Sequence, residues 1–407
     1  MLTLTSQNEL WRIRVGAVLS ALLLTASTAV AQGVREPKVS VAPTHGVYIN
    51  SHGNRWAWGE NQYGQYGGGD AQIPPSSRTP VPVPGRKEIV DVAVGWGYSL
   101  FLLADGTALA TGENGRGQLG VGRIDILPGT RETPAPVSVP TPIAGLAGVK
   151  QLAAGRLFAV ALLEDGTVMA WGDRWDGKLG DGETGPFSDR QTNIPTPRPV
   201  RGLSGVKQIA VGSDFAFALL NNGTVMGWGR AVRGRLGEAV TVKTGVPVPI
   251  RGLERVKQIA ASNENGLALL EDSTVRTWGS RASAIVLHPQ DFSRDGFSAT
   301  PVAVPGLRNV RSLVAGPEAS HVMAILSDGT VRTWGWNGYY NQGLGHNSEY
   351  VMRLGQPKIT GVVAGAVIYS TTYFVLRDGS LLASGPFLPR PEKMYKVPTV
   401  IVKAPGR

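Results

Sequence analysis

The sequence predicts an all-β protein, a seven-bladed β-propeller of four-stranded antiparallel blades, from three observations. A short apolar run that ends in Trp-Gly, or in a decayed form of it, recurs seven times at a spacing of 50 to 60 residues. This period is too long for helical-hairpin repeats and suits a four-stranded sheet with its loops. An Asp-Gly or Asn-Gly pair, typical of a tight turn, precedes most copies of this Trp-Gly mark, and a proline-rich run follows several copies. The seven marks are Trp58-Gly59, Thr111-Gly112, Trp171-Gly172, Trp228-Gly229, Trp278-Gly279, Trp334-Gly335 and Ser384-Gly385.

Each repeat supplies three consecutive strands, which we call a, b and c. In the third unit they are expected at 149–155, 158–163 and 168–172, and the fourth unit repeats them at 206–212, 215–220 and 225–229. Asp-Gly or Asn-Gly between strands b and c predicts a tight hairpin of type I′, in which both central residues have positive φ. This pair stands at Asp105-Gly106, Asp165-Gly166, Asn222-Gly223, Asp328-Gly329 and Asp378-Gly379, with Asp272-Ser273 and His52-Gly53 in its place elsewhere.

A proline-rich fourth strand, d, completes each blade. Examples are 79–84, 196–200, 246–250 and 300–304. Proline lacks a backbone N–H for the sheet, so these runs are expected at the outer edge of each blade. The last such run, 395–402, should lie beside the first strand, 39–41, and thereby close the ring. The sequence leaves open whether the C-terminal strand completes the last blade or joins the first.

The N-terminal 31 residues are expected to form a cleaved secretory signal peptide. Arg12 and Arg14 precede an apolar stretch that closes with Ala29-Val30-Ala31. A transmembrane anchor, the alternative, needs roughly 20 apolar residues, and Ser and Thr interrupt this run. The predicted organisation is signal peptide 1–31, a short lead 32–37, one propeller 38–402 and a tail 403–407. We therefore expect a periplasmic or extracellular monomer with no membrane span after cleavage.

Charge and cysteine content limit the kinds of partner and site. The chain has 407 residues and a formal charge of +10, which becomes +9 when the predicted signal peptide, with two Arg and one Glu, is removed. A basic exported protein favours anionic partners such as acidic polysaccharide, nucleic acid or an acidic protein face. There are no cysteines, which excludes disulfides and thiolate metal sites.

The residues that folding explains least are expected on one face of the disc. If strand a rises, the a–b turn and the c–d loop share a face, and the long, dissimilar insertions all belong to c–d loops. Arg and aromatic residues, which are enriched in interaction hot spots, gather in the same segments. We take them as a candidate binding surface: Trp96, Arg116, Arg156, Arg174, Trp175, Arg230, Arg233, Trp336, Tyr339 and Tyr340.

The opposite face carries a regular set of cations at the start of strand a: Lys150, Lys207, Lys257 and Arg311. Equivalent positions on a ring form a ring of charge. The interpretation favoured from the sequence is that these side chains are solvated and discourage edge pairing, and the alternative is an anion site.

Two segments resemble the regulator of chromosome condensation repeat. Trp58 to Gly67 and Gly112 to Gly120 follow its pattern Trp-Gly-x-Asn-x-x-Gly-Gln-Leu-Gly, and Asp-Gly-Thr followed by Trp-Gly strengthens the likeness. The resemblance implies a seven-bladed propeller. The family's His near the start of strand b is present as His45 and His321 but replaced elsewhere, which suggests a divergent, secreted bacterial member whose histidines belong to the core. Exchange activity on a host GTPase, which some members have, would require delivery into a host cell.

Few residues point to catalysis. The five His form no metal-ligating pair, and no nucleophile elbow or phosphate loop is present. We expect a non-enzymatic propeller that binds a protein partner and needs no cofactor or metal. Two alternatives stay open: a polyanion or glycan binder that uses the basic surface, and a propeller hydrolase or lyase with carboxylates and His gathered around the channel.

Overall fold

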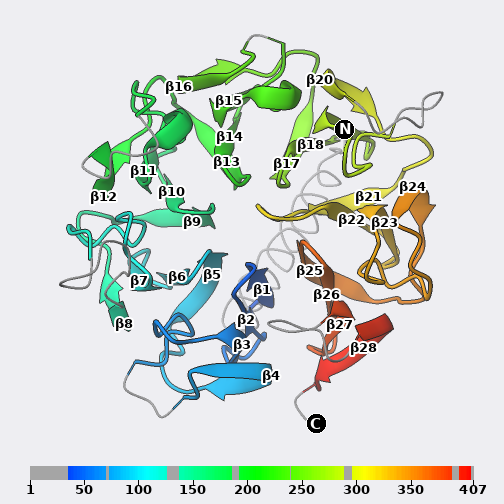
Figure 1. The fold of residues 1–407 in the computed structure, drawn as a ribbon, viewed down its shortest axis with the longest axis horizontal. Helices are drawn as coiled ribbons and strands as arrows, with labels where there is room; N and C mark the ends of the chain where they lie inside the picture. The colour runs from blue at the N-terminus through cyan, green and yellow to red at the C-terminus, as the bar shows by residue number, and fades with distance from the viewer. Residues whose placement is uncertain are drawn as a thin grey trace, which may run out of the picture.

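The computed structural model describes residues 35–69, 73–125, 137–185, 192–238, 240–287, 296–386 and 394–404. The predicted signal peptide lies outside these residues. Seven four-stranded antiparallel sheets are arranged as blades around a central axis (Figure 1), as predicted. No helix among the described residues has the length and hydrophobicity needed to cross a lipid bilayer.

Each blade is one continuous segment whose strands run outward from the axis in chain order. The first three blades are β1 (Lys38–Val41), β2 (His45–Ile49), β3 (Arg55–Glu60), β4 (Ser76–Val83); β5 (Ile89–Gly95), β6 (Tyr98–Leu103), β7 (Ala108–Gly112), β8 (Val137–Pro142); and β9 (Val149–Ala154), β10 (Phe158–Leu163), β11 (Val168–Gly172), β12 (Ile194–Pro199). The next two are β13 (Val206–Val211), β14 (Phe215–Leu220), β15 (Val225–Arg230), β16 (Lys243–Pro249); and β17 (Val256–Ala261), β18 (Asn265–Leu270), β19 (Val275–Ser280), β20 (Phe297–Ala303). The last two are β21 (Val310–Val314), β22 (His321–Leu326), β23 (Val331–Trp336), β24 (Tyr350–Gly355); and β25 (Val362–Ile368), β26 (Thr371–Leu376), β27 (Leu381–Pro386), β28 (Met394–Val402).

The b–c hairpins differ from the predicted type I′ turn. In the second blade Gly106 N–H donates to Leu103 O and Leu103 N–H to Thr107 O, which makes a three-residue connection. Gly106 has φ +79°, whereas Asp105 is not in the left-handed region. Asp105 Oδ1 instead accepts the Thr107 N–H at 2.9 Å. The Asp-Gly-Thr signature therefore encodes a type I turn followed by a left-handed glycine.

The glycine of the Trp-Gly mark is retained in all seven blades because its backbone requires it. Its φ lies between +95° and +113° in every copy. A Cβ on Gly59 would lie 2.2 Å from Thr44 O, and one on Gly229 would lie 2.6 Å from Asp214 O. In both blades the close atom belongs to the a–b turn, so a side chain at this position would push the turn away from strand c.

The tryptophan of the mark joins neighbouring blades. Trp171 Nε1 donates to Gln118 O of the preceding blade at 2.9 Å, and the indoles of Trp228, Trp278 and Trp334 make the same bond. All of these side chains are fully buried. Where the mark decays, a hydroxyl replaces the indole: Thr111 Oγ1 donates to Gly64 O and Ser384 Oγ to Asn341 O, both at 2.9 Å.

The ring closes between two complete blades, which settles the question that the sequence left open. β28 pairs with β27 in the last blade, and β1 pairs with β2 in the first. The two blades then pack directly against each other, and Trp58 Nε1 donates to a side-chain acceptor, Tyr373 Oη, at 3.0 Å. Their buried side chains form one hydrophobic cluster, so apolar packing between blades seals the ring.

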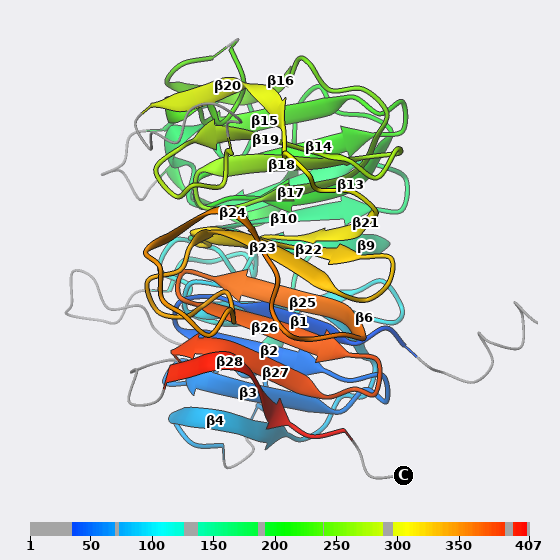
Figure 2. The same ribbon diagram turned by 90° about the vertical axis from the view of Figure 1, so that its right-hand side faces the viewer.

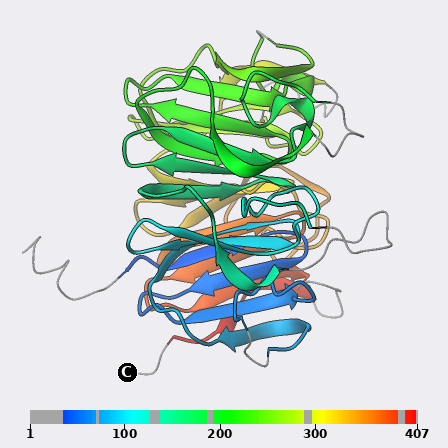
Figure 3. The same cartoon turned by 90° about the vertical axis from the view of Figure 1, so that its left-hand side faces the viewer.

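Figures 2 and 3 show the disc edge-on from opposite directions, with β1 beginning and β28 ending at the same face of the disc. This face, which we call the turn face, holds the b–c turns and d–a turns. The other side, the long-loop face, holds the a–b turns and the c–d loops. Backbone bonds from the start of the c–d loop to the a–b turn confirm that these two segments lie together, as in Glu60 N–H to Thr44 O at 2.8 Å and Arg230 N–H to Asp214 O at 2.9 Å.

Candidate binding face

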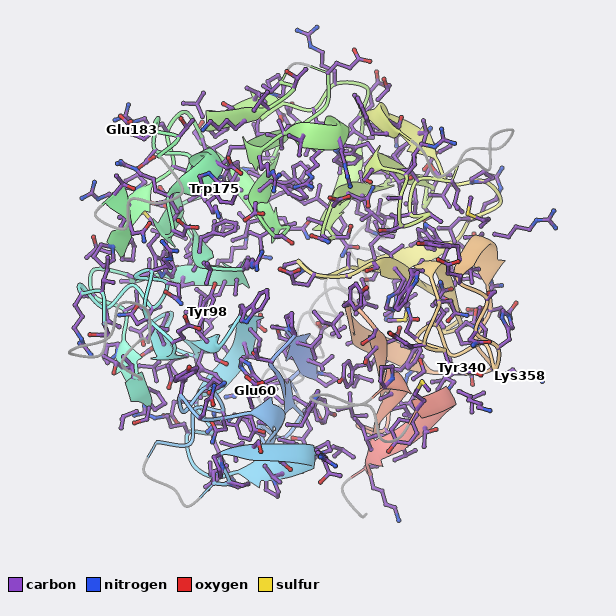
Figure 4. All side chains as sticks on the ribbon, in the orientation of Figure 1. Glu60, Tyr98, Trp175, Glu183, Tyr340 and Lys358 are labelled. Carbon is purple, nitrogen blue, oxygen red and sulfur yellow. The ribbon has the colours of Figure 1, made fainter. Side chains whose placement is uncertain are left out.

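All ten residues predicted for the binding surface lie in a–b turns or c–d loops or at the end of strand c, and therefore at the long-loop face. They do not form one cluster. Eight of them fall into three groups: a pair near the axis, a charged group over the third to fifth blades and an aromatic group at the sixth and seventh. Trp175 and Tyr340, labelled in Figure 4, lie on opposite sides of the ring.

The central channel is closed at this face. A channel of about 430 Å³ runs along the inner strands of all seven blades. The a–b turn of the sixth blade, between β21 and β22, is longer than the other a–b turns, and its Gly316 and Pro317 line the channel. At the end of the channel, Pro317 and Glu318 share a cavity of only about 10 Å³ with Trp96 and Arg156. The long-loop face is therefore continuous across its centre.

Trp96 and Arg156 form a cation–π pair beside this closure. The Arg156 guanidinium carbon lies 4.3 Å from the centroid of the Trp96 ring, within the range of an attractive contact. Burial raises the pKa of Glu318, although Arg156 acts in the opposite direction. Ser213 Oγ donates to Pro317 O at 2.6 Å, which ties the turn of the fourth blade to that of the sixth.

Lys178 is the centre of the charged group. Its ammonium is 1% exposed and lies 3.0 Å from both Asp173 Oδ2 and Asp214 Oδ1. It also lies 5.4 Å from the centroid of the Trp175 ring. Asp214 belongs to the a–b turn of the next blade, so this ion pair joins the third blade to the fourth. A buried cation between two carboxylates is a structural element, since removing either charge leaves the other unpaired.

The same arrangement is repeated one blade later. Arg235 is 4% exposed and donates to Glu264 Oε1 at 2.7 Å, while the more exposed Arg233 donates to Glu264 Oε2 at 2.7 Å. Burial opposes ionisation of Glu264, but Arg235 and Arg233 hold its pKa below the usual range. Arg230 lies 3.9 Å from Asp214 and 3.7 Å from Asp176 and so adds a second cation, from the fourth blade, to the Lys178 group.

Short connecting segments place these side chains. The 3₁₀ turns Trp175–Gly177 and Val232–Gly234 follow β11 and β15 closely, with Asp176 and Arg233 in the left-handed region at φ +61°. Arg174 turns toward its own loop and donates to Asp181 Oδ2 from Nη2 at 2.6 Å and from Nε at 2.9 Å. Arg174 is thus held by an internal ion pair, whereas Arg233 is 55% exposed.

The aromatic group contains Trp336, Tyr339 and a residue that the sequence analysis missed, Tyr369. The Tyr339 ring is perpendicular to Trp336 at a centroid distance of 5.0 Å, and Tyr369 lies 5.1 Å from Trp336 on another side. Tyr339 is 46% and Tyr369 53% exposed. Exposed contiguous aromatic rings that are not needed for the core are typical of interaction surfaces.

Two predicted residues lie apart from these groups. Tyr340 has φ +60°, and its ring lies 5.4 Å from the Lys396 ammonium of β28. Arg116 is half-buried in the c–d loop of the second blade, and its backbone N–H donates to Gln118 Oε1 at 2.8 Å.

The channel offers little for catalysis. Among the described residues that line it, Glu36 is the only carboxylate, and histidine is absent. The buried His45 and His321 instead join blades: His45 Nε2 lies 2.7 Å from Ser99 Oγ, and His321 Nε2 lies 2.6 Å from Thr372 Oγ1. Burial lowers both pKa values to about 3. The described channel wall therefore lacks the carboxylate and His cluster that the hydrolase alternative requires.

Comparison with known sequences decides the family. Models of the Regulator of chromosome condensation (RCC1) repeat match residues 52–102, 165–219 and 222–269 in one form and residues 89–118, 149–173, 206–235 and 310–342 in another. Together these matches cover more than half of the chain. The chain belongs to the RCC1 repeat family.

Several curated RCC1 relatives are similar over part of the chain. The human E3 ubiquitin-protein ligase HERC2 is 29% identical over 52% of the chain, and the Ultraviolet-B receptor UVR8 of Arabidopsis thaliana is 26% identical over 76%. Human Protein RCC2 is 28% identical over 48%. The matched region spans 4% of HERC2, 67% of UVR8 and 39% of RCC2.

Several solved structures share the fold. Prp20p from Saccharomyces cerevisiae, which has been studied for its binding to Gsp1p and histones, superposes with a TM-score of 0.71 at 24% identity and covers 86% of this chain and 85% of its own. Human WBSCR16 superposes with a TM-score of 0.71 at 19% identity, covering 86% and 94%.

The RCC1 repeat pattern also explains what the sequence analysis overlooked. Lys178 and Arg235 occupy the position of the glutamine in Gly-Gln-Leu-Gly, where the first two blades have Gln65 and Gln118. The partners Asp214 and Glu264 immediately precede strand b of the following blade. A cation at the glutamine position, together with an acidic residue just before strand b of the next blade, could have predicted these ion pairs from the sequence. Tyr369 offered no such signal, because only folding brings it to Trp336.

Proposed function

We propose that this RCC1-repeat protein is a non-enzymatic binding propeller that engages a protein partner through the long-loop face. The observation that supports it most is that the sixth-blade turn closes the channel there, which leaves an uninterrupted surface between the charged and the aromatic groups. Tyr339, Tyr369 and Arg233 project from that surface without being buried in the fold. Exposed aromatic and Arg side chains of this kind supply most of the binding energy in protein interfaces.

The relatives support protein binding as the general activity. Prp20p has been examined for its binding to Gsp1p and histones. Whether this chain meets a comparable partner depends on its location. We propose that it is a divergent bacterial member, exported by the N-terminal 31 residues and acting as a monomer in the periplasm or outside the cell. A host GTPase then becomes a partner only after delivery into a host cell.

Site-specific photo-crosslinking tests the face assignment in the cells that produce the protein. A photoreactive phenylalanine analogue is placed at Arg233 or Tyr339 on the long-loop face, and at the exposed Arg308 or Lys358 on the turn face as matched controls. We expect the same discrete protein adduct from the first two positions and none from the controls. Adducts of one protein from the turn-face positions alone would overturn the proposal, as would an absence of adducts from all four positions.

A further inference from the structure

The channel has a second end, at the turn face, and its mouth differs from the closed end. Glu36, Pro37 and Lys38 line the channel there, and on the third to sixth blades the wall begins at the third residue of the inner strand: Gln151, Gln208, Gln258 and Ser312. Three glutamines on consecutive blades tie the inner strands to one another: Gln151 to Ile209, Gln208 to Ile259 and Gln258 to Leu313. Each side chain both donates to and accepts from the next strand's backbone at 2.9 to 3.1 Å. The wall is therefore rigid where the channel opens.

A β-bulge stands beside each of these positions. The pairing of strand a with strand b shifts by one residue at the start of strand a in the second to seventh blades. A bulge redirects the side chain of the extra residue away from the regular alternation. The bulged residues are Val90, Lys150, Lys207, Lys257, Arg311 and Val363. On four consecutive blades the bulged residue is a cation that directly precedes a residue of the channel wall, namely Gln151, Gln208, Gln258 or Ser312, so these cations lie at the rim of the mouth.

These four cations make no ion pair with any other described residue. Lys207 Nζ lies 3.5 Å from the neutral carbonyl of Val256, and Arg311 Nη2 donates to Val362 O at 3.2 Å and to Val363 O at 3.1 Å. Both side chains thus reach the backbone of the inner strand in the next blade. The charged group on the long-loop face differs, because there each of Arg174, Lys178, Arg230, Arg233 and Arg235 lies beside a carboxylate.

We propose that this arc of cations at the open mouth of the channel, which we call the cation arc, is a binding site for a compact polyphosphate. Lysine ammonium groups bind phosphate as point charges, and a recess with low-dielectric walls concentrates their field. The channel volume of about 430 Å³ is in the usual range for small-molecule sites. Because the channel is closed at its far end, a compact anion fits it better than a polymer that would have to thread through.

Isothermal titration of the purified protein with inositol hexakisphosphate at 0.15 M salt tests the site. We expect saturable binding of one ligand per chain. The triple substitution Lys150→Gln, Lys207→Gln and Lys257→Gln should weaken it about 30-fold or more, because three charge-assisted contacts are lost. The matched control, Arg201→Gln with Arg251→Gln and Arg308→Gln, removes the same charge from the outer part of the same face and should change affinity less than about threefold.

The absence of cysteine allows an independent measurement of where the ligand sits. In an Ala210→Cys variant the single thiol lies in the channel wall, and hexakisphosphate should slow its reaction with a bulky thiol reagent. Equal losses of affinity in the two triple variants would overturn the proposal, because they would indicate a general effect of net charge. An unchanged thiol reaction rate at saturating ligand would overturn it as well, and so would tighter binding of heparin than of hexakisphosphate to the same lysines, which would assign the arc to an extended polymer.

Discussion

Lys178 of the third blade and Asp214 of the fourth form a buried ion pair at 3.0 Å, at the place where the first blades use a neutral glutamine. The equivalent pair one blade earlier is Gln118 and Leu157. The interface between these blades has therefore exchanged a neutral contact for a charged one. The exchange places a carboxylate 3.9 Å from the partly exposed Arg230 and so links blade packing to the long-loop face.

Substituting Lys178 tests this relationship. Lys178→Gln should destabilise the protein by about 3–5 kcal/mol, because Asp173 would lose its cation and Asp214 would keep only the more distant Arg230. The double variant Lys178→Gln with Asp214→Leu reproduces the second-to-third blade contact and should recover part of the loss. Denaturant unfolding monitored by tryptophan fluorescence measures both. A double variant no more stable than Lys178→Gln alone would contradict this explanation.

The buried histidines predict a loss of stability in acid. Burial lowers the pKa of His45 and of His321 to about 3, so the unfolded chain binds protons below pH 6.5 that the folded protein excludes. Each histidine contributes stability that is complete above pH 6.5 and declines as the pH falls toward 3, by about 2 kcal/mol per residue at pH 5. The His45→Gln and His321→Gln double variant should show a shallower loss between pH 6.5 and 5, measured by urea unfolding; an unchanged slope would contradict this.

Thr111 provides a test of the hydroxyl that replaces the indole. Its Oγ1 lies 2.9 Å from Gly64 O of the first blade and 2.6 Å from Val137 O of its own blade, and its one hydroxyl proton is shared between these two acceptors. Thr111→Val keeps the shape but leaves these two acceptors without their donor, and should cost about 1–3 kcal/mol. The control is Thr141→Val, whose hydroxyl bond to Val139 O is exposed, and it should cost less than about 0.5 kcal/mol. Thermal unfolding compares the two, and equal shifts would be evidence against the interblade role.

Alanine substitutions at two glycines allow the cost of backbone strain to be distinguished from the cost of a steric clash. Gly229 and Gly202 both have positive φ, at +100° and +71°. A Cβ on Gly229 meets Asp214 O at 2.6 Å, whereas a Cβ on Gly202 meets nothing within 4 Å. Gly202→Ala should cost about 1 kcal/mol from backbone strain alone, and Gly229→Ala should cost several kcal/mol more because the a–b turn must move. Similar unfolding midpoints for the two variants would contradict this explanation.

The sequence predicted the blades because each strand carries its own local signal. The Trp-Gly mark, the Asp-Gly turn and the proline-rich edge strand act within a few residues, so a single repeat already shows them. The type I′ turn was wrong because Asp105 satisfies the backbone with its side chain instead of adopting positive φ. Ring closure was ambiguous because β28 would have been equally compatible with either blade.

The candidate face was harder to predict because its clusters depend on contacts between blades. Trp336 and Tyr339 are close in sequence, but Tyr369 joins them only through packing of the seventh blade on the sixth. The pairing of Arg233 with Glu264 likewise crosses a blade boundary. The Pro317 and Glu318 turn that closes the channel could be recognised only as a longer a–b connection, and its position over the axis required the whole ring.

The most direct test of the long-loop face as the binding surface is the dissociation constant of the partner identified by crosslinking, measured with purified proteins. Tyr339→Ala with Tyr369→Ala removes two exposed rings and should weaken binding by about tenfold to a hundredfold, since hot-spot residues contribute 1–3 kcal/mol or more. The turn-face control Arg308→Ala with Lys358→Ala should leave the constant within about threefold. An unchanged constant in the tyrosine variant, with loss in the turn-face variant, would contradict the assignment.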